Sequence, residues 1–237
     1  MTYDALELTR TEAAAFVVAA RVDLDAAVPS CPKWQVRQLV AHLGGVYEWC
    51  ALNLPRGTSE PPTATRPVHD PADPALLEWF DEVTDRVLQV LREAPPGGPA
   101  WSFAAQHPQT TDFWPRRMAL ETAVHRWDAQ SAHRDASGFD LPVAVDGIDE
   151  VLTVMRPAQL AHRRTELTGV VGVRLTDADR SWTVRVEPTG MRPTPDTPDA
   201  VLSGTASGVL LGLWGRVPLS SLALTGDEAL ASAVRAS

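Results

Sequence analysis

The sequence predicts an α+β protein in which a four-helix bundle is followed by a smaller, mixed α/β domain. Four long segments in the first part of the chain carry apolar residues at helical spacing. Beyond them, short segments alternate apolar and polar residues and are joined by polar turns, a pattern typical of strands. The change from helical to strand-like patterns near residue 141 therefore predicts two domains, residues 1–140 and residues 141–237.

The first two helices are expected over residues 5–27 and 29–54. Residues 5–27 are rich in alanine and contain neither glycine nor proline, which favours a helix. In the second segment Ser30 suits an N-cap, and Pro32 would then lie in the first turn. The pair Gly44–Gly45 lowers helix propensity, but the apolar pattern resumes after it, so one continuous helix is expected.

The third and fourth helices are expected over residues 75–94 and 114–133, each after a long loop that contains several prolines or glycines. The third has a clear amphipathic pattern. The fourth is expected to bury Leu120, Val124 and Trp127. Four helices of this length indicate a bundle.

The second part of the chain alternates between helix and strand signals. Residues 169–188 predict two strands joined by a polar turn. The remaining expected elements are helices over residues 146–160, 205–216 and 227–236, and strands over residues 200–204 and 219–226.

Composition and charge exclude several classes of function. The formal net charge of −9 argues against binding to nucleic acid or to an anionic membrane surface. The acidic N-terminus has no apolar secretory region, and the longest apolar stretches are too short to span a bilayer. Two cysteines, Cys31 and Cys50, cannot form a disulfide framework. We therefore expect a reduced, cytoplasmic protein.

One stretch of the fourth helix carries residues that can form part of a metal site. Glu121, His125 and Asp128 lie at i, i+4 and i+7, so they share one helical face. The alternative is an ordinary Glu–His helix pair with a solvated Asp128. His42, at the edge of the apolar stripe of the second helix, is a candidate third ligand. Two imidazoles and a carboxylate with open positions suit catalytic Zn²⁺ or non-haem Fe²⁺.

The segments "CPKWQVRQLVAHLGG" and "WPRRMALETAVHRWDAQ" closely resemble the mycothiol-dependent maleylpyruvate isomerase family, within the DinB-like metal-dependent superfamily. The resemblance extends to "AVLSGTASGVLLGLWGR" and "LTGDEAL", so it covers nearly the whole chain. It implies a DinB-like four-helix bundle whose metal ligands are His42, Glu121 and His125. It also implies that an essential arginine of the C-terminal domain corresponds to Arg216.

The resemblance implies Zn²⁺ or another divalent metal and mycothiol as cofactors, with a small electrophile as substrate. The expected reaction is isomerisation of a maleylpyruvate-like cis alkene or transfer of the thiol sulfur to the electrophile. The rival is a binding or regulatory module that keeps the bundle without turnover. We expect a monomer or a homodimer, with neither nucleic acid nor membrane as partner.

Further expectations concern individual residues. Asp128 is expected to pair with an arginine or to cap a neighbouring element rather than to orient His125. The loops around His69 and around Trp101–His107 are expected at the substrate pocket, with His107 a candidate acid or base. The metal end of the bundle is expected to offer no cation of its own, so that Arg216 would supply the charge that orients a carboxylate. The alternative for Arg216 is an interaction with the negative end of a helix.

Overall fold

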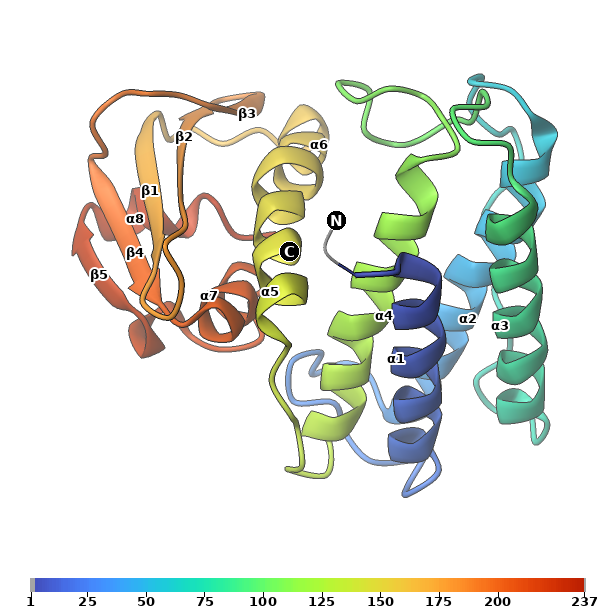
Figure 1. The fold of residues 1–237 in the computed structure, drawn as a ribbon. Coiled ribbons are helices and arrows are strands. Elements are labelled where there is room, and N and C mark those ends of the chain that lie inside the picture. The colour runs from blue at the N-terminus through green and yellow to red at the C-terminus, as the bar shows by residue number, and fades with distance from the viewer. Residues whose placement is uncertain (1–2, 237) are drawn as a thin grey trace. The chain divides into compact units, whose positions relative to one another are not determined.

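The computed structural model describes residues 3–236 and divides at Ser137 and Gly138 into two compact units. The first unit is helical, and the second combines a mixed five-stranded sheet with helices (Figure 1). The predicted α+β class is therefore confirmed. In the described residues, no helix is long and apolar enough to cross a membrane.

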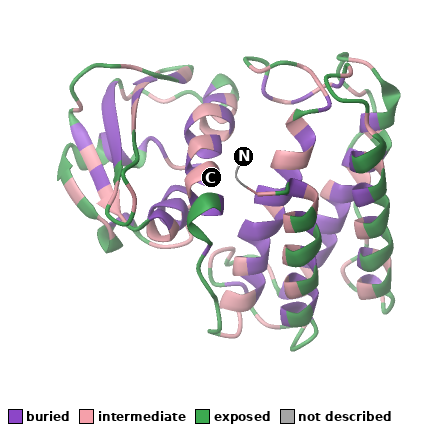
Figure 2. Cartoon of the chain, in the orientation of Figure 1, coloured by how far each residue is buried: buried purple, intermediate pink, exposed green. Residues whose placement is uncertain are grey.

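Four α-helices of the first unit enclose one apolar core. Helix α1 packs mainly against α4, and α2 packs mainly against α3. Figure 2 shows α3 buried along one side and exposed along the other, as its sequence pattern predicts. The elements are α1 (Ala5–Ala20), α2 (Val36–Asn53), the 3₁₀ turn η1 (Leu54–Arg56), α3 (Leu76–Glu93) and α4 (Phe113–Ser131).

Both of the first two predicted helices are shorter than expected. Helix α1 ends at Ala20 rather than near residue 27, and the Asp23 carboxylate accepts the backbone N–H of Asp25 in a local turn. Such side-chain bonds to nearby backbone compete with helix formation. Helix α2 begins at Val36 with Gln35 as its N-cap, so the prediction that Ser30 caps it was wrong.

Two glycines of α2 allow other elements to approach it closely. A Cβ on Gly44 would lie 2.4 Å from the ring of Trp79 on α3, and one on Gly45 would lie 2.9 Å from the carbonyl oxygen of Pro67. Both distances are too short for a side chain. The glycines therefore cost helix propensity but bring α3 and the loop before it against the helix that carries His42.

The core residues that α4 contributes differ from the predicted stripe. Leu120 and Val124 are buried, as predicted, whereas Trp127 is only partly buried. The apolar core of the bundle instead takes Trp114, Met118 and Ala129 from this helix. Because α4 is buried on much of its circumference, its sequence has no sharp amphipathic pattern from which the core face could be read.

In the second unit a helical stretch precedes the sheet, whose strand order is β3-β2-β1-β4-β5. Strands β1 and β4 pair in parallel, and the other neighbours are antiparallel. The elements are α5 (Leu141–Glu150), the π-helical segment η2 (Val151–Met155), α6 (Arg156–His162), β1 (Gly169–Leu175), β2 (Ser181–Glu187), β3 (Gly190–Pro193), β4 (Ala200–Gly204), α7 (Ala206–Leu213), the 3₁₀ turn η3 (Leu219–Ser221), β5 (Ala223–Gly226) and α8 (Glu228–Ser232).

Three details of this unit differ from expectation. The helix predicted over residues 146–160 is interrupted by the π-helical segment, which ends two residues before Pro157, a residue that has no N–H to donate. The strand β3 was not predicted. The strand predicted over residues 219–226 is confined to Ala223–Gly226, after a 3₁₀ turn.

Candidate metal centre

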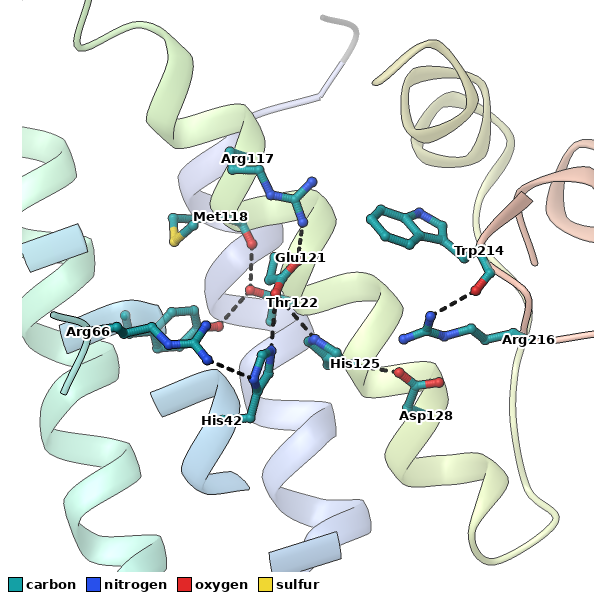
Figure 3. A network of polar contacts seen from close by, with 11 residues as sticks. His42, Arg66, Arg117, Met118, Glu121, Thr122, His125, Asp128, Trp214 and Arg216 are labelled. Carbon is teal, nitrogen blue, oxygen red and sulfur yellow. Dashed lines mark hydrogen bonds and ion pairs between the residues drawn. The ribbon is translucent and has the colours of Figure 1, made fainter. Parts of the chain in front are cut away.

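His42, Glu121 and His125 lie together in the helical unit, and one possible ligand atom of each lies within 4.8 Å of the others. His42 comes from α2, and Glu121 and His125 come from adjacent turns of α4 (Figure 3). The Glu121 Oε1 atom is 3.2 Å from His125 Nε2 and 3.6 Å from His42 Nε2. The sequence left open whether α2 and α4 bring these residues together, and in the structure they converge.

A buried hydrogen-bond chain fixes α2 against α4 next to this cluster. The Thr122 hydroxyl donates to the Met118 carbonyl at 2.6 Å, so it accepts the hydroxyl proton of Tyr47 at 2.6 Å. Tyr47 lies on α2 and is fully buried, which raises the pKa of its hydroxyl. Since Thr122 follows Glu121 directly, this contact sets the register in which His42 faces Glu121.

Glu121 is held from two sides. Its Oε1 atom faces the two imidazoles, and its Oε2 atom accepts a hydrogen bond from the guanidinium of Arg117, one helical turn earlier. Burial would raise the pKa of Glu121, but Arg117 and the two histidines hold it well below its usual value. Glu121 is therefore a carboxylate at neutral pH, with one oxygen directed at the histidines.

His125 is oriented by a partner that the sequence analysis assigned elsewhere. Its Nδ1 atom lies 3.0 Å from Asp128 Oδ2, and Asp128 Oδ1 accepts the hydroxyl of Ser30 at 2.6 Å. The expectations of a solvated Asp128 and of one that does not orient His125 were wrong, since Asp128 is fully buried. A proton on Nδ1 leaves the Nε2 lone pair of His125 directed at the cluster.

The two imidazoles differ in their affinity for protons. Burial lowers the pKa of His42, an effect that the nearby Glu121 only partly offsets. Burial also acts to lower the pKa of His125, but Glu121 and Asp128 together outweigh it, and that pKa is raised. Close to neutral pH His125 therefore keeps its proton more readily than His42 does.

The donor set fits a divalent metal. In a tetrahedral zinc site with bonds of about 2.0–2.1 Å, neighbouring ligand atoms lie about 3.3 Å apart. The two distances from Glu121 Oε1, 3.2 and 3.6 Å, already approach that value. Three protein ligands would leave a fourth position for water or another ligand.

A pocket of ≈ 220 Å³ adjoins the cluster through His42. The loop around His69 lines this pocket, and the ring of Trp34 packs on His42 with 4.9 Å between the centroids. That the pocket binds a substrate stays a prediction. The loop around Trp101–His107 contributes none of the residues that line this pocket. Trp101 packs on Trp49, and its carbonyl accepts the indole N–H of Trp114.

The remaining candidates occupy other settings. Arg216 lies in the second unit, beyond the end of α7, where its Nη1 atom donates to the Trp214 carbonyl at 2.8 Å. Cys50 is buried among apolar residues, which raises the pKa of its thiol, and Cys31 is a partly buried cysteine that forms no disulfide. Burial in this way disfavours the thiolate, so Cys50 is unsuited to act as a nucleophile.

Three residues that support the cluster were not predicted: Arg117, Arg66 and, through Asp128, Ser30. Arg117 had a detectable signal, because it stands four residues before Glu121 on a predicted helix. Ser30 and Arg66 had none, since each reaches the cluster from a loop. The Nη2 atom of Arg66 lies 3.5 Å from His42 Nδ1. The expectation that the metal end of the bundle offers no cation was therefore wrong.

Comparisons with known proteins agree with this architecture. The family model described as the mycothiol maleylpyruvate isomerase N-terminal domain matches residues 6–130, and the MDMPI C-terminal domain model matches residues 142–233. A search of curated protein sequences finds no match. The crystal structure of the mycothiol-dependent maleylpyruvate isomerase is similar at a TM-score of 0.65 and 14% identity, covering 93% of this chain and 91% of that chain. A mutant of that enzyme gives a TM-score of 0.63 at 14% identity, with the same coverage of both chains.

Proposed function

Because the chain belongs to the mycothiol-dependent maleylpyruvate isomerase family through both of its domains, we propose that it is a metal-dependent enzyme that uses mycothiol to transform a small electrophile. The observation that carries the proposal is the convergence of His42, Glu121 and His125. The proposed metal is Zn²⁺, since two imidazoles and one carboxylate form a common catalytic zinc site, although other divalent metals accept the same ligands.

When bound, the metal would stabilise the thiolate form of mycothiol, whose sulfur adds to an electron-poor alkene and leaves again after bond rotation, or attacks the electrophile and stays attached. The first course is cis–trans isomerisation, and the second is S-transfer. In neither course does the chain need a nucleophile of its own. This agrees with the buried position of Cys50.

The chain's own residues prepare the centre. Asp128 keeps the Nδ1 proton of His125, so Nε2 stays available as a ligand atom. Arg117 occupies one oxygen of Glu121, which directs the other oxygen to the centre. The ring of Trp34 packs on His42.

We assign to Arg216 the binding of a carboxylate of the substrate or the cofactor, as the family resemblance implies. A planar, permanently charged fork orients a carboxylate better than a point charge does. Arg216→Lys is expected to keep the fold and the metal but to lose most turnover. Its hydrogen bond to the Trp214 carbonyl supports a purely local role as well. Normal steady-state kinetics in Arg216→Lys, with an unchanged melting temperature, would leave only that local role.

The test of the proposed function combines metal analysis with thiol-dependent turnover. Purified protein is expected to hold about one divalent metal per chain, consistent with a single ligand cluster. With mycothiol and a maleyl electrophile, formation of the trans isomer without loss of thiol identifies an isomerase, and stoichiometric loss of thiol identifies an S-transferase. The matched control is the Cys31→Ser/Cys50→Ser double variant, which should remain active.

Two results would contradict the proposal. Turnover that continues after removal of all low-molecular-weight thiol would exclude the thiol-dependent reaction. Binding of small molecules without turnover of any electrophile would support the rival proposal, a non-catalytic binding or regulatory module. Size-exclusion chromatography with light scattering tests the further proposal of a monomer or a homodimer.

A further inference from the structure

A second pocket lies at the end of the bundle where α2 and α3 both end. Gly44 of α2 lies against Trp79, near the start of α3. Leu54, just after α2, lines the pocket together with Val90, near the end of α3, so the two helices run parallel. The volume of the pocket is ≈ 290 Å³, close to the lower limit of about 300 Å³ for sites that bind small molecules. Its lining consists of Leu54, Pro55, Gly57, Val90, Glu93, Ala94, Pro95, Pro99 and Thr111.

This pocket is separate from the candidate metal centre. It shares no lining residue with the pocket beside His42, and neither Glu121 nor His125 lines it. Helix α2 rises by about 17 Å between His42 and its last residue, Asn53, at about 1.5 Å per residue. A ligand in this pocket would therefore not touch the metal.

The wall of the pocket is held by hydrogen bonds of its own. The hydroxyl of Thr111 donates to the carbonyl of Pro95 at 2.6 Å, and the N–H of Gly98 donates to the same carbonyl at 3.0 Å. The N–H of Thr111 donates to the carbonyl of Gly98 at 2.9 Å, and Pro99 forms a β-bridge with Thr110. The segment after α3 is therefore fixed against the segment before α4, so the pocket does not depend on a ligand for its shape.

The N–H groups of the lining residues already have partners within the chain. Three of the lining residues are prolines, which have no N–H. The N–H groups of Val90 and Glu93 lie inside α3, and that of Ala94 donates to the carbonyl of Val90. The N–H groups of Leu54 and Gly57 donate to carbonyls of the preceding turn. The described lining therefore offers a ligand apolar surface and hydrogen-bond acceptors, but no free donor.

The lining also carries a negative charge. Among its described residues, Glu93 is the only ionisable one. The recorded contact of its carboxylate is with the side-chain amide of Gln89, 3.0 Å from Oε1, and not with a cation. Arg56, which stands between two lining residues, donates instead to the carbonyl of Glu60 at 3.3 Å. The carboxylate of Glu93 is therefore available to a ligand.

The ends of the helices add to this negative charge. Pro95 and Pro96 stand where N–H groups would otherwise bond the last carbonyls of α3, and neither has one. Helix α2 ends at the same pocket, so the negative ends of two helix dipoles lie there. Helix α4 begins nearby, but its N-cap residue is Asp112, an anion that offsets the positive end. A cation is therefore the charge that fits this pocket.

We propose that this pocket binds a small apolar ammonium ion, a ligand that the proposed function does not involve. The ammonium group would donate to the Glu93 carboxylate, and the apolar body would lie against Leu54, Val90 and the prolines. An anion would face the carboxylate and find no donor, so it should not bind. A neutral alcohol of the same shape should bind more weakly than the ammonium ion, because it carries no charge.

The experiment follows the amide resonances of the whole chain by NMR during titration with cyclohexylmethylammonium, cyclohexylmethanol or cyclohexanecarboxylate. The ammonium ion is expected to shift the resonances of residues 54–57 and 90–99, with the same affinity in zinc-loaded and zinc-free protein. The alcohol should bind about 3- to 10-fold more weakly, a range between an exposed ion pair and a buried hydrogen bond to a charged group. The carboxylate should not bind. Glu93→Gln should lower the affinity for the ammonium ion to that for the alcohol.

The matched control is Glu82→Gln, which removes an exposed carboxylate of the same helix that does not line the pocket. It should bind the ammonium ion like the wild type. Ala94→Leu enlarges a lining side chain, so it should abolish the binding of the ammonium ion and of the alcohol while resonances outside the pocket stay in place.

Several results would overturn the inference. Absence of ammonium binding by the wild type would do so, and so would unchanged ammonium affinity in Glu93→Gln or in Ala94→Leu. Resonance shifts confined to the surroundings of His42 and His125, or an affinity that requires zinc, would place the ligand at the metal centre instead. Tighter binding of the carboxylate than of the ammonium ion would show that the pocket has the opposite preference for charge.

Discussion

The two histidines of the candidate centre are the same chemical group held in two different ways. His125 on α4 has a side chain that is 8% exposed, and its Nδ1 atom bonds the fully buried Asp128. His42 on α2 is 21% exposed, packs on Trp34 and has Arg66 near its Nδ1 atom. Helix α4 carries Glu121 and the more buried histidine, His125, whereas α2 carries the more exposed histidine, His42.

The two histidines also differ in the charged groups that surround them. Arg117, Glu121, His125 and Asp128 all lie on α4, and they form an alternating series of cation, anion, imidazole and anion. Each member of the series forms a hydrogen bond or an ion pair with the next one. His42 instead has Glu121 on one side and the cation of Arg66 on the other. The α4 residues are therefore paired with one another without a metal, whereas His42 lies between a carboxylate and a cation.

The largest expected effect comes from removing the carboxylate at the centre of the α4 series. Glu121→Gln takes the anion away from Arg117, whose side chain is 4% exposed. Loss of one partner from a buried ion pair costs about 3–5 kcal/mol of unfolding free energy, and metal retention should also be lost. Urea denaturation and elemental analysis measure the two effects.

The control for Glu121→Gln is the double variant Arg117→Met/Glu121→Gln. It removes the cation as well, so it should recover much of the unfolding free energy while still failing to hold the metal. If the single variant is as stable as the wild type, Arg117 does not depend on this carboxylate, and the α4 side is not the self-supporting series described above.

The second prediction sets the two histidines against each other. His125→Ala takes an imidazole from the buried Asp128 and should cost about 2–3 kcal/mol in the metal-free protein, as expected for a hydrogen bond to a charged group. His42→Ala should cost about 1 kcal/mol or less, because its contacts are more exposed. Both variants should lose most of their metal. Equal destabilisation would remove the distinction between the two sides, and full metal retention in His42→Ala would remove His42 from the centre.

The comparison also explains what the sequence could predict. The alternation in β2 and the apolar pattern of α3 predicted their elements, because a half-buried strand or helix shows its period in the sequence. Strand β1 is buried over its first five residues, so its apolar run marks it instead. Glu121 and His125 were detectable for the same reason, since one helix fixes their spacing. The start of α2 could not be predicted from the sequence. The segment before it forms turns, and the hydrogen bonds of turns produce no periodic pattern of apolar residues.

Both sides of the centre depend on contacts between distant parts of the chain. Ser30 reaches Asp128 across 98 residues, and Arg66 reaches His42 from a loop. Neither contact follows from local spacing. Ser30 was therefore predicted as the N-cap of α2, a position that Gln35 takes, and no role was predicted for Arg66. The family resemblance supplied His42 as a ligand, but it could not supply these supporting contacts.

The third prediction uses the opposite pKa directions of the two imidazoles. Because the pKa of His125 is raised, His125 stays protonated to a higher pH in the metal-free protein than His42 does. A metal must displace that proton, so zinc affinity should rise about tenfold per pH unit below the pKa of His125 and level off above it. Calorimetry in buffers of different ionisation enthalpy counts the protons released.

In the metal-free protein, the contribution of His125 to the free energy of unfolding falls as the pH rises, whereas the zinc affinity rises. A raised pKa in the folded state means that the protonated His125 stabilises the fold, fully so below the unfolded pKa, and that this contribution is lost as the pH rises through the folded value. The stabilisation by zinc should grow over the same interval. Zinc affinity that is independent of pH would show that His125 carries no proton for the metal to displace.

The smallest expected effect, from Ser30→Ala, tests how far the α4 side extends. The Ser30 hydroxyl donates to the second oxygen of Asp128, so its loss leaves that oxygen without this donor and should cost about 1 kcal/mol. If the bond also keeps Asp128 directed at His125, zinc affinity should fall, but by less than the roughly 10- to 100-fold expected for Asp128→Asn, which alters the direct partner of a ligand. Calorimetry on both variants measures this order. Suppose that Ser30→Ala loses stability but keeps wild-type zinc affinity, whereas Asp128→Asn loses affinity. The residues that orient the proposed ligands on α4 would then include Asp128 but not Ser30. Ser30 would then only hold the turn before α2 against α4, without any effect on the orientation of His125.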